Sequence, residues 1–354
     1  MPHIRSLAAG LLLTASFSAP GWAVPSPSVS TAVTVSGQVV TPTTFGYPAL
    51  QALPQATQTE TYLAGRTPVT NTFTGPTLWG VLNAAGCIAT NPAVKNDVVQ
   101  TYIIATGADG YKSVISAGEI APNFGHKPDL VAIGDSGGTL PGSAGVARVT
   151  ASGDVAGGRY VSNTASLQVG HGPAIPGTGG GITSSFTVSG NVNTPISFTL
   201  SSLQALTPYT KTVTYKAGGT PVTDTYTGAL LWDVLASAGI ATDPSIKNDI
   251  LRQVVVATGS DGYSVDFAAG ELSPMFGNEP ILVAYSDTAG QLGAGGTSGF
   301  ARLIVPGDIA GGRYVSNLSG LYVFDATRVP EPASALFLAT GLLGCFWSRR
   351  RRAA

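Results

Sequence analysis

Apolar residues recur with the period of an α-helix at two places in the chain. Each place has four apolar side chains at positions i, i+3, i+4 and i+7, which lie on one face of a helix. A glycine follows each series and ends the predicted helix. The pattern therefore predicts two short amphipathic helices in the same register. Their apolar positions are Leu78, Val81, Leu82 and Ala85 before Gly86, and Leu231, Val234, Leu235 and Ala238 before Gly239.

Other apolar runs are β-branched and aromatic, which is typical of strands. Residues 98–105 and 253–257 form two such runs, and an Asp-Gly pair follows each of them closely. Asp-Gly suits the tight turn of a β-hairpin, so we expect Asp109 and Asp261 to be turn formers. Such strands, combined with a few short helices, predict a β-rich α+β fold.

These elements occur twice because the chain contains an internal repeat. The segment Thr34-Val35-Ser36-Gly37 recurs as Thr187-Val188-Ser189-Gly190, at an offset of 153 residues. Each copy has about 140 residues, which is the size of a domain and too long for a solenoid unit. We therefore expect two tandem domains, over residues 24–169 and 185–326. A linker rich in Gly and Pro over residues 170–184 would join them.

Composition excludes some classes of function. Charged residues make up 10% of the chain and the net charge is −1, so no basic patch can neutralise phosphates and we expect no nucleic-acid partner. Hydrophobic residues make up 44%, which is enough to build folded cores. His126 is matched by Asn278 in the second copy and His171 lies in the expected linker, so we expect no metal site.

Both ends of the chain carry targeting signals. An apolar stretch follows Arg5, and small residues precede Val24, so residues 1–23 are expected to be a signal peptide. Near the C-terminus an uncharged run over residues 333–347 predicts a single-helix membrane anchor, and the cations after it would stay on the cytoplasmic side. Before this run stand Val329, Pro330, Glu331 and Pro332, and after it stand Arg349, Arg350, Arg351 and Arg352.

The order of a Pro-Glu-Pro motif, an apolar run and an arginine cluster resembles the PEP-CTERM sorting signal, here over residues 329–354. The resemblance implies that a signal peptidase and an exosortase process the chain, and that the C-terminal segment holds it transiently in the inner membrane. It implies export to the periplasm, the cell surface or the extracellular matrix. An exopolysaccharide would be a further partner there.

A second resemblance extends over both copies. A Leu-x-x-Leu-Pro segment ends at Pro54, and a Thr-Gly-x-x-Leu-Trp segment, which ends at Trp79, opens the predicted helix. Three further motifs follow in order: Asp-Gly-Tyr, a lone Gly before Ala-Arg, and Gly-Asp with Gly-Arg-Tyr-Val. This series resembles the molybdopterin-binding domain of the sulfite-oxidase family. The resemblance implies an oxidoreductase fold, with basic residues near a molybdenum cofactor. The basic residues at the matching positions are Arg148, Arg159, Arg302 and Arg313.

The chain departs from that family where the metal would bind. Active members ligate molybdenum through a cysteine thiolate in the strand after the Leu-Pro segment, whereas this chain has Tyr62 in the first copy and Tyr215 in the second. Cys87 does not align with that position, because it is one extra residue at the end of the first predicted helix. The upstream segment that holds the pterin in the larger enzymes is also missing. These departures favour a domain that has lost its cofactor.

Several residues therefore have two interpretations. Each arginine of the Gly-Arg-Tyr-Val motif either contacts a phosphate or carboxylate of a ligand, or pairs with Asp154 or Asp308 to close a turn. Glu119 and Glu271 are interpreted as caps or fold markers rather than catalytic acids. We expect Trp79 and Trp232 to make core or interdomain contacts rather than to stack on sugars.

The sequence thus predicts an exported, exosortase-processed surface or matrix protein, without catalysis, built from two degenerate molybdopterin-binding-like domains. Two alternatives stay open. One is an oxidoreductase or cofactor-binding protein that holds molybdopterin through the four arginines, and the other is a binder of a small molecule or glycan in the cleft between the copies.

Overall fold

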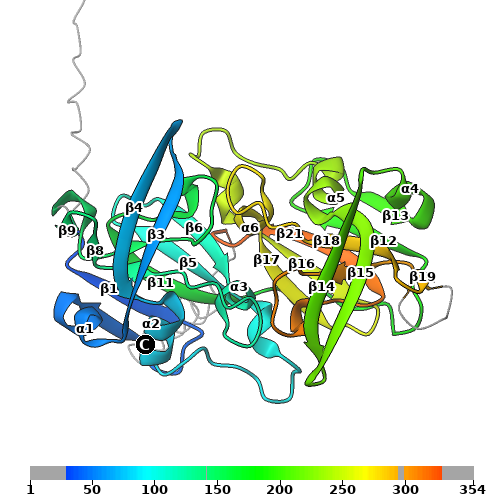
Figure 1. Ribbon diagram of the computed structural model, residues 1–354, viewed down its shortest axis with the longest axis horizontal. Coiled ribbons are helices and arrows are strands. Elements are labelled where there is room, and N and C mark those ends of the chain that lie inside the picture. Colours follow the sequence, from blue (N-terminus) through cyan, green and yellow to red (C-terminus); the bar gives the residue numbers. More distant parts are fainter. Residues whose placement is uncertain (1–28, 141, 294–298, 329–354) are drawn as a thin grey trace, which may run out of the picture.

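The computed structural model describes residues 29–140, 142–293 and 299–328. The signal peptide predicted over residues 1–23 and the sorting signal predicted over residues 329–354 lie outside these residues. Two similar halves, which we call the first and second repeats, lie side by side along the long axis (Figure 1). The chain is rich in strands and has few, short helices, which confirms the β-rich class.

Each repeat contains a five-stranded sheet of the same topology. The orders are β2-β1-β11-β5-β6 and β13-β12-β21-β16-β17. In both sheets the first strand of the repeat pairs in parallel with the last one, and the other pairs are antiparallel. The strands of the first sheet are β1 (Ala32–Gly37), β2 (Thr43–Gly46), β5 (Thr101–Gly107), β6 (Lys112–Ser116) and β11 (Thr164–His171). Those of the second are β12 (Ser185–Gly190), β13 (Ile196–Thr199), β16 (Gln253–Gly259), β17 (Ser264–Ala268) and β21 (Leu318–Asp325).

A long hairpin starts a further sheet in each repeat. In the first repeat this sheet is β3 (Gln55–Ala64), β4 (Thr67–Pro76), β8 (Gly134–Asp135) and β9 (Gly138–Thr139), next to a pair formed by β7 (Val131–Ala132) and β10 (Arg148–Val149). In the second it is β14 (Pro208–Ala217), β15 (Thr220–Leu230), β18 (Leu282–Asp287) and β19 (Gly290–Gln291), with β20 (Arg302–Ile304) on β18. Three cross-strand threonine pairs link the solvent faces of each hairpin, such as Thr59 with Thr72 and Thr212 with Thr225. Such pairs stabilise a two-stranded ribbon.

The two predicted amphipathic helices are confirmed as α2 (Leu78–Ala84) and α5 (Leu231–Ala238). The apolar faces of both helices pack against the sheets and are buried. The insertion of Cys87 is also visible, since Val39 bridges Ile88 just as Val192 bridges Ile240. The other helices are α1 (Tyr47–Ala52), α3 (Ala117–Ile120), α4 (Leu200–Gln204) and α6 (Ala269–Leu272).

The strand predicted over residues 98–105 begins later than expected. Asp97–Gln100 form a 3-10 turn instead, and β5 starts at Thr101. The turn forms because Asn96 has a left-handed backbone (φ 54°) and its carbonyl oxygen accepts a hydrogen bond from Val99 N. The strand predicted over residues 253–257 is confirmed as part of β16.

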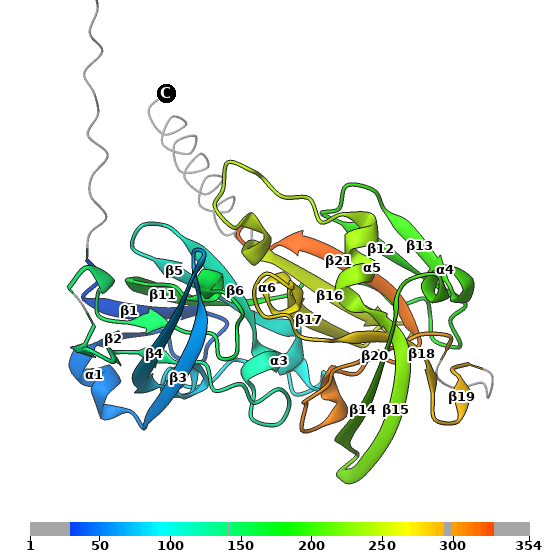
Figure 2. The ribbon, with the colours of Figure 1, turned by 45° about the horizontal axis from the view of Figure 1, so that its top comes forward.

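The repeats share an apolar layer as well as having cores of their own. Tyr102, Ile104 and Val114 of the first sheet form one buried cluster with Val254, Val256, Ala268 and Phe324 of the second. The strands β6 and β17 are edge strands of the two sheets and contact each other near the centre of the molecule (Figure 2). The segment that we expected to be a linker starts inside β11, which runs to His171, and then lies against the second repeat, where Gly180 N donates to Ser260 O at 2.7 Å.

Candidate functional site: the interface between the repeats

The Gly-Gly-Arg motif of each repeat places an arginine in a buried ion-pair network. Arg159 is fully buried and its Nε and Nη2 atoms donate to Asp154 at 2.9 and 2.5 Å. Its Nη1 and Nη2 atoms also donate to Glu119 at 2.8 and 2.9 Å. Arg313 repeats the arrangement with Asp308 at 2.9 and 2.6 Å and with Glu271 at 2.5 Å. The turn-closing pairs with Asp154 and Asp308 are therefore present, and a ligand could reach either guanidinium only by breaking them.

Burial and charge act against each other in this network. Burial favours the neutral form of Glu119, but the guanidinium of Arg159 and the ammonium of Lys127 outweigh it and lower the pKa of this carboxyl to about 2. Burial raises the pKa of Glu271 to about 7 against the opposing effect of Arg313, and the charge of Glu119 adds to the rise. Ser116 Oγ of the first repeat donates a hydrogen bond to Glu271 of the second at 3.0 Å, so a direct contact links the polar networks of the two repeats.

The contacts between the repeats are reciprocal. The ring of Phe276 lies against Gly158 and the ring of Phe124 lies against Gly312, so closely that a Cβ atom at either glycine would come within 2.1 Å of the ring. Each phenylalanine carbonyl also accepts a hydrogen bond from the other repeat, from Val155 N at 2.8 Å and from Ile309 N at 2.9 Å. The interface therefore has an approximate two-fold arrangement that depends on glycine at both contacts.

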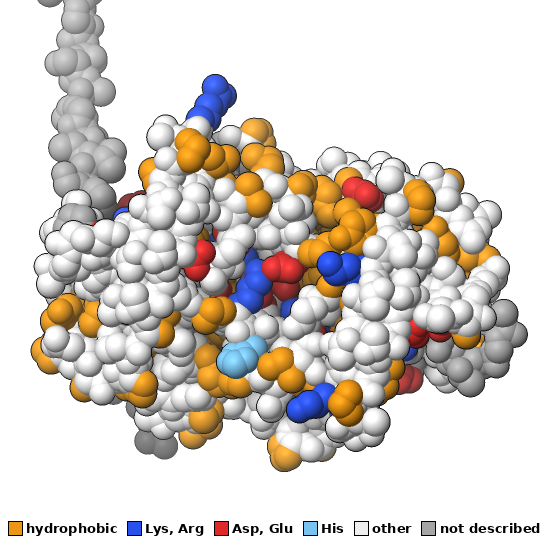
Figure 3. All heavy atoms as spheres, viewed as in Figure 1, with side chains coloured by type: hydrophobic (Ala, Val, Ile, Leu, Met, Phe, Trp, Pro, Cys, Tyr) orange, Lys and Arg blue, Asp and Glu red, His pale blue; other side chains and the backbone are white. Residues whose placement is uncertain are grey.

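Polar side chains continue the same symmetry. Tyr111 Oη donates to Gly158 O at 2.6 Å and accepts from Asn248 Nδ2 of the second repeat at 3.0 Å. Tyr263 makes the equivalent contacts with Gly312 and with Asn96. Lys127 of the first repeat pairs with Glu279 of the second at 2.5 Å. Charged side chains gather in the hollow between the two halves (Figure 3).

A cavity of about 360 Å³ opens beside this interface, between Arg148 and Tyr62 of the first repeat and Lys247 and Met275 of the second. A neighbouring hollow of about 240 Å³ shares Lys247 and the Gly-Gly backbone with it and adds Asp109 and Tyr111. We call the first of these the inter-repeat cavity. It brings Arg148 together with residues that lie about a hundred positions away in the sequence.

Aromatic side chains stand at the two positions where the sequence resemblance would place a thiolate. The ring of Tyr62 packs in a tilted arrangement against Tyr160, with centroids 4.4 Å apart and an interplanar angle of 40°, and Tyr215 packs against Tyr314 at the same distance and 39°. Cys87 is exposed at the end of α2, and it does not line the inter-repeat cavity. The residues at this place therefore do not fit a thiolate-ligated molybdenum centre.

The four predicted arginines divide into two kinds. Arg159 and Arg313 are held by carboxylates, as described above, whereas Arg148 and Arg302 lie over aromatic rings. Arg148 lies over Phe73, at 5.9 Å from the ring centroid, and Arg302 lies over Tyr226 and Tyr314, at 6.0 and 5.7 Å.

Other sequence predictions can be located as well. Asp109 and Asp261 are turn formers, since each accepts the backbone N–H two residues later at 3.0 Å. Trp79 packs against the cores of both repeats and Trp232 against that of the second. Glu119 and Glu271 are buried ion-pair partners of Arg159 and Arg313 rather than side-chain caps. At the start of α3 the cap is Ser116, whose Oγ accepts a hydrogen bond from Glu119 N. In the part of the chain that the structure describes, no group of His, Cys, Asp and Glu could hold a metal ion.

Sequence reasoning missed Phe124, Phe276, Lys127 and Lys247. The repeated Phe-Gly pairs at residues 124–125 and 276–277 were a usable signal, because they stand at the repeat offset.

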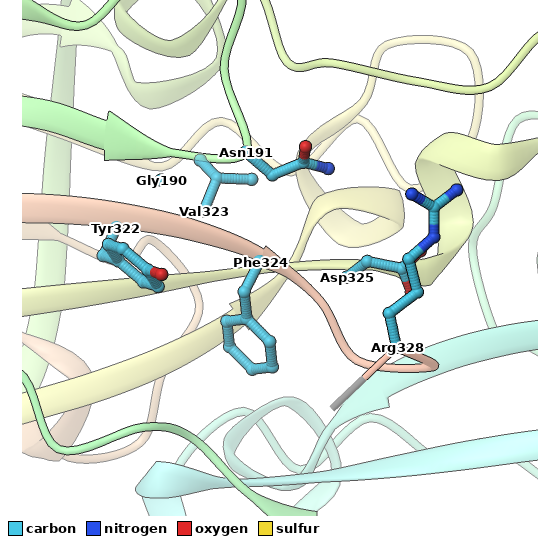
Figure 4. A pocket seen from close by; sticks show the side chains of 7 residues that line it. All are labelled: Gly190, Asn191, Tyr322, Val323, Phe324, Asp325 and Arg328. Carbon is cyan, nitrogen blue, oxygen red and sulfur yellow. The ribbon is translucent and has the colours of Figure 1, made fainter. Parts of the chain in front are cut away.

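A further hollow of about 410 Å³ lies at the end of β21, where Arg328 and Asp325 stand beside Asn191 (Figure 4). Arg328 Nε pairs with Asp325 at 2.9 Å. Arg328 is also the last described residue before the Pro-Glu-Pro motif. Over the described ranges no helix is long and apolar enough to cross a membrane, and the span predicted at residues 333–347 lies outside them.

Comparison with known families identifies residues 328–352 as a PEP-CTERM protein-sorting motif. This confirms the C-terminal interpretation and supports an exported protein that an exosortase processes and that is transiently anchored in the membrane. Comparison with curated proteins gives no match.

A solved structure to which the chain is similar is the sulfane dehydrogenase SoxCD from Paracoccus pantotrophus, with 20% sequence identity and a TM-score of 0.34. The likeness covers 45% of this chain and 42% of that one, so the chain spans less than half of its length. A likeness of this degree carries no argument about activity.

Proposed function

We propose that the chain is an exported, exosortase-processed protein of the cell surface or matrix, whose body is a non-catalytic scaffold of two degenerate molybdopterin-binding-like domains. The observation that carries the proposal is the pair of tyrosines at the thiolate position. Tyr62 and Tyr215 pack in tilted ring contacts against Tyr160 and Tyr314, so an aromatic contact stands where the resemblance would place a metal ligand. The sorting motif at residues 328–352 supports the exported and processed part of the proposal.

The second candidate is a protein that binds molybdopterin without a thiolate. One observation favours it, namely that Arg148 lines a cavity and has no carboxylate partner among the described residues. The paired state of Arg159 and Arg313 speaks against it, because two of the four proposed phosphate contacts are already engaged.

We expect the mature protein to begin at about Val24 and to lack the segment after Pro332. Intact-mass measurement on protein purified from the native host decides this, since loss of the segments before Val24 and after Pro332 lowers the mass by the sum of their residues. A matched sample from a host that lacks its exosortase should retain Arg349, Arg350, Arg351 and Arg352. Recovery of these arginines from the normal host would contradict exosortase processing.

A further inference from the structure

The inter-repeat cavity contains two cations and no carboxylate. Arg148 of β10 is half-buried and Lys247 is exposed at its rim, and neither Asp nor Glu lines the cavity. This is unusual for a chain in which acidic residues are as numerous as basic ones, 19 against 18. By contrast, each of the buried arginines Arg159 and Arg313 forms ion pairs with two carboxylates.

Arg148 is left unsatisfied by the protein itself. Its Nε atom is buried and has no hydrogen-bond partner among the described residues, and its guanidinium lies over the face of Phe73. In the second repeat, Arg302 lies over two tyrosine rings and its Nη2 is 3.5 Å from Tyr215 Oη. The ammonium of Lys247 lies 5.8 Å from the centroid of the Tyr111 ring. A buried guanidinium donor without a partner is costly, so a ligand that accepts its hydrogen bonds would be bound favourably.

The rest of the cavity wall is largely apolar. Tyr62 and Leu63 come from the end of β3, and Phe276 and Met275 come from the loop after α6. Met275 is 68% exposed, which is unusual for a large apolar side chain in this protein. An exposed methionine beside aromatic rings is typical of a surface that adapts to an apolar partner. Because the cations and the apolar wall come from both repeats, the cavity depends on their docking.

We propose that the inter-repeat cavity binds a small organic anion. Its carboxylate would meet Arg148 and Lys247, and its planar or apolar body would lie against Tyr62, Met275 and Phe276. A volume of about 360 Å³ is sufficient for a ligand of this kind, since small-molecule sites begin at roughly 300 Å³. The site does not require a thiolate and does not depend on the scaffold role proposed above.

Isothermal titration at low ionic strength tests the proposal with benzoate, glucuronate, benzyl alcohol and inorganic phosphate. We expect the protein to bind at least one of the two carboxylates, and to bind benzyl alcohol and phosphate at least tenfold more weakly. Stronger binding of benzoate would identify an aromatic ligand body, and stronger binding of glucuronate would identify an acidic sugar, and either supports the site. Absence of binding by both carboxylates, or equally tight binding of phosphate, would overturn it.

Substitutions of the two cations test whether the carboxylate binds in the inter-repeat cavity. Arg148→Met and Lys247→Met should each weaken carboxylate binding at least tenfold, because each removes a cation from the cavity. Arg66→Met and Lys211→Met are the matched controls, since both residues are exposed on the hairpins and lie outside the cavity. Circular dichroism verifies the fold of each variant. If the cavity variants and the controls bind equally, the carboxylate binds elsewhere and the proposal fails.

Discussion

Replacement of Arg159 by methionine should lower the free energy of unfolding by about 3–5 kcal/mol. The side chain is fully buried, and its removal leaves the carboxylates of Asp154 and Glu119 without their principal cation. Each carboxylate would then have to take up a proton or remain as an unpaired buried charge, and both are unfavourable. Urea unfolding at pH 7, followed by circular dichroism, measures the loss.

The matched control is Arg66→Met, which removes the same charge from the exposed turn between β3 and β4 and should change the stability by less than about 0.5 kcal/mol. If Arg159→Met does not fold, Arg159→Lys retains a cation and should recover part of the stability. An Arg159→Met protein as stable as the control would show that the buried network does not hold this interface.

Replacement of Asp266 by asparagine should stabilise the protein at pH 8. Asp266 of β17 is fully buried against Gly172, and neither of its carboxylate oxygens has a hydrogen-bond partner among the described residues. The N–H of Gly172 donates to Gln100 O at 2.9 Å and so is already engaged. Burial raises the pKa of this carboxyl from 3.8 to about 7, against the opposing effect of His171.

The pH dependence of the stability follows from the difference in proton binding between the folded and the unfolded chain. Between pH 4 and pH 7 the unfolded chain has released the Asp266 proton while the folded chain keeps it, so the folded state loses stability as the pH rises through this window. Above pH 7 both states are ionised and the full penalty remains. Asparagine has no such charge, so Asp266→Asn should gain roughly 4 kcal/mol over the unmodified protein at pH 8, which is about 3 pKa units, and little at pH 4.

Unfolding free energies at pH 4.5 and pH 8 measure this difference. The control is Asp109→Asn, which removes the same charge at an exposed turn position where asparagine can make the same hydrogen bond, and it should gain less stability at pH 8 than Asp266→Asn. A destabilisation by Asp266→Asn that is equal at both pH values would contradict a buried, high-pKa carboxyl.

Local elements of this fold can be predicted from the sequence because their causes are local. The four apolar positions of α2 and the glycine after it determine that helix, and Asp109 determines its hairpin turn. The start of β5 was predicted wrongly because the left-handed backbone of Asn96 ends the extended run, and nothing in the apolar pattern at residues 98–100 indicates this.

The site could be predicted only in part. The family resemblance identified Arg148 and Arg159, but it could not show that one lines a cavity and that the other is held by carboxylates. That difference depends on Glu119 and on Lys247, which are about 40 and 100 residues away from these arginines and reach them only through the docking of sheets and repeats.

We propose that the body of this exported protein has lost the metal chemistry of the family that it resembles. Elemental analysis of mature protein, purified without chelators from the native host grown with ample molybdate, tests it most directly. A main determinant of a metal site is its ligand set, and Tyr62 and Tyr215 do not supply the thiolate. The account predicts molybdenum far below one atom per chain, and a content near one atom per repeat would contradict it.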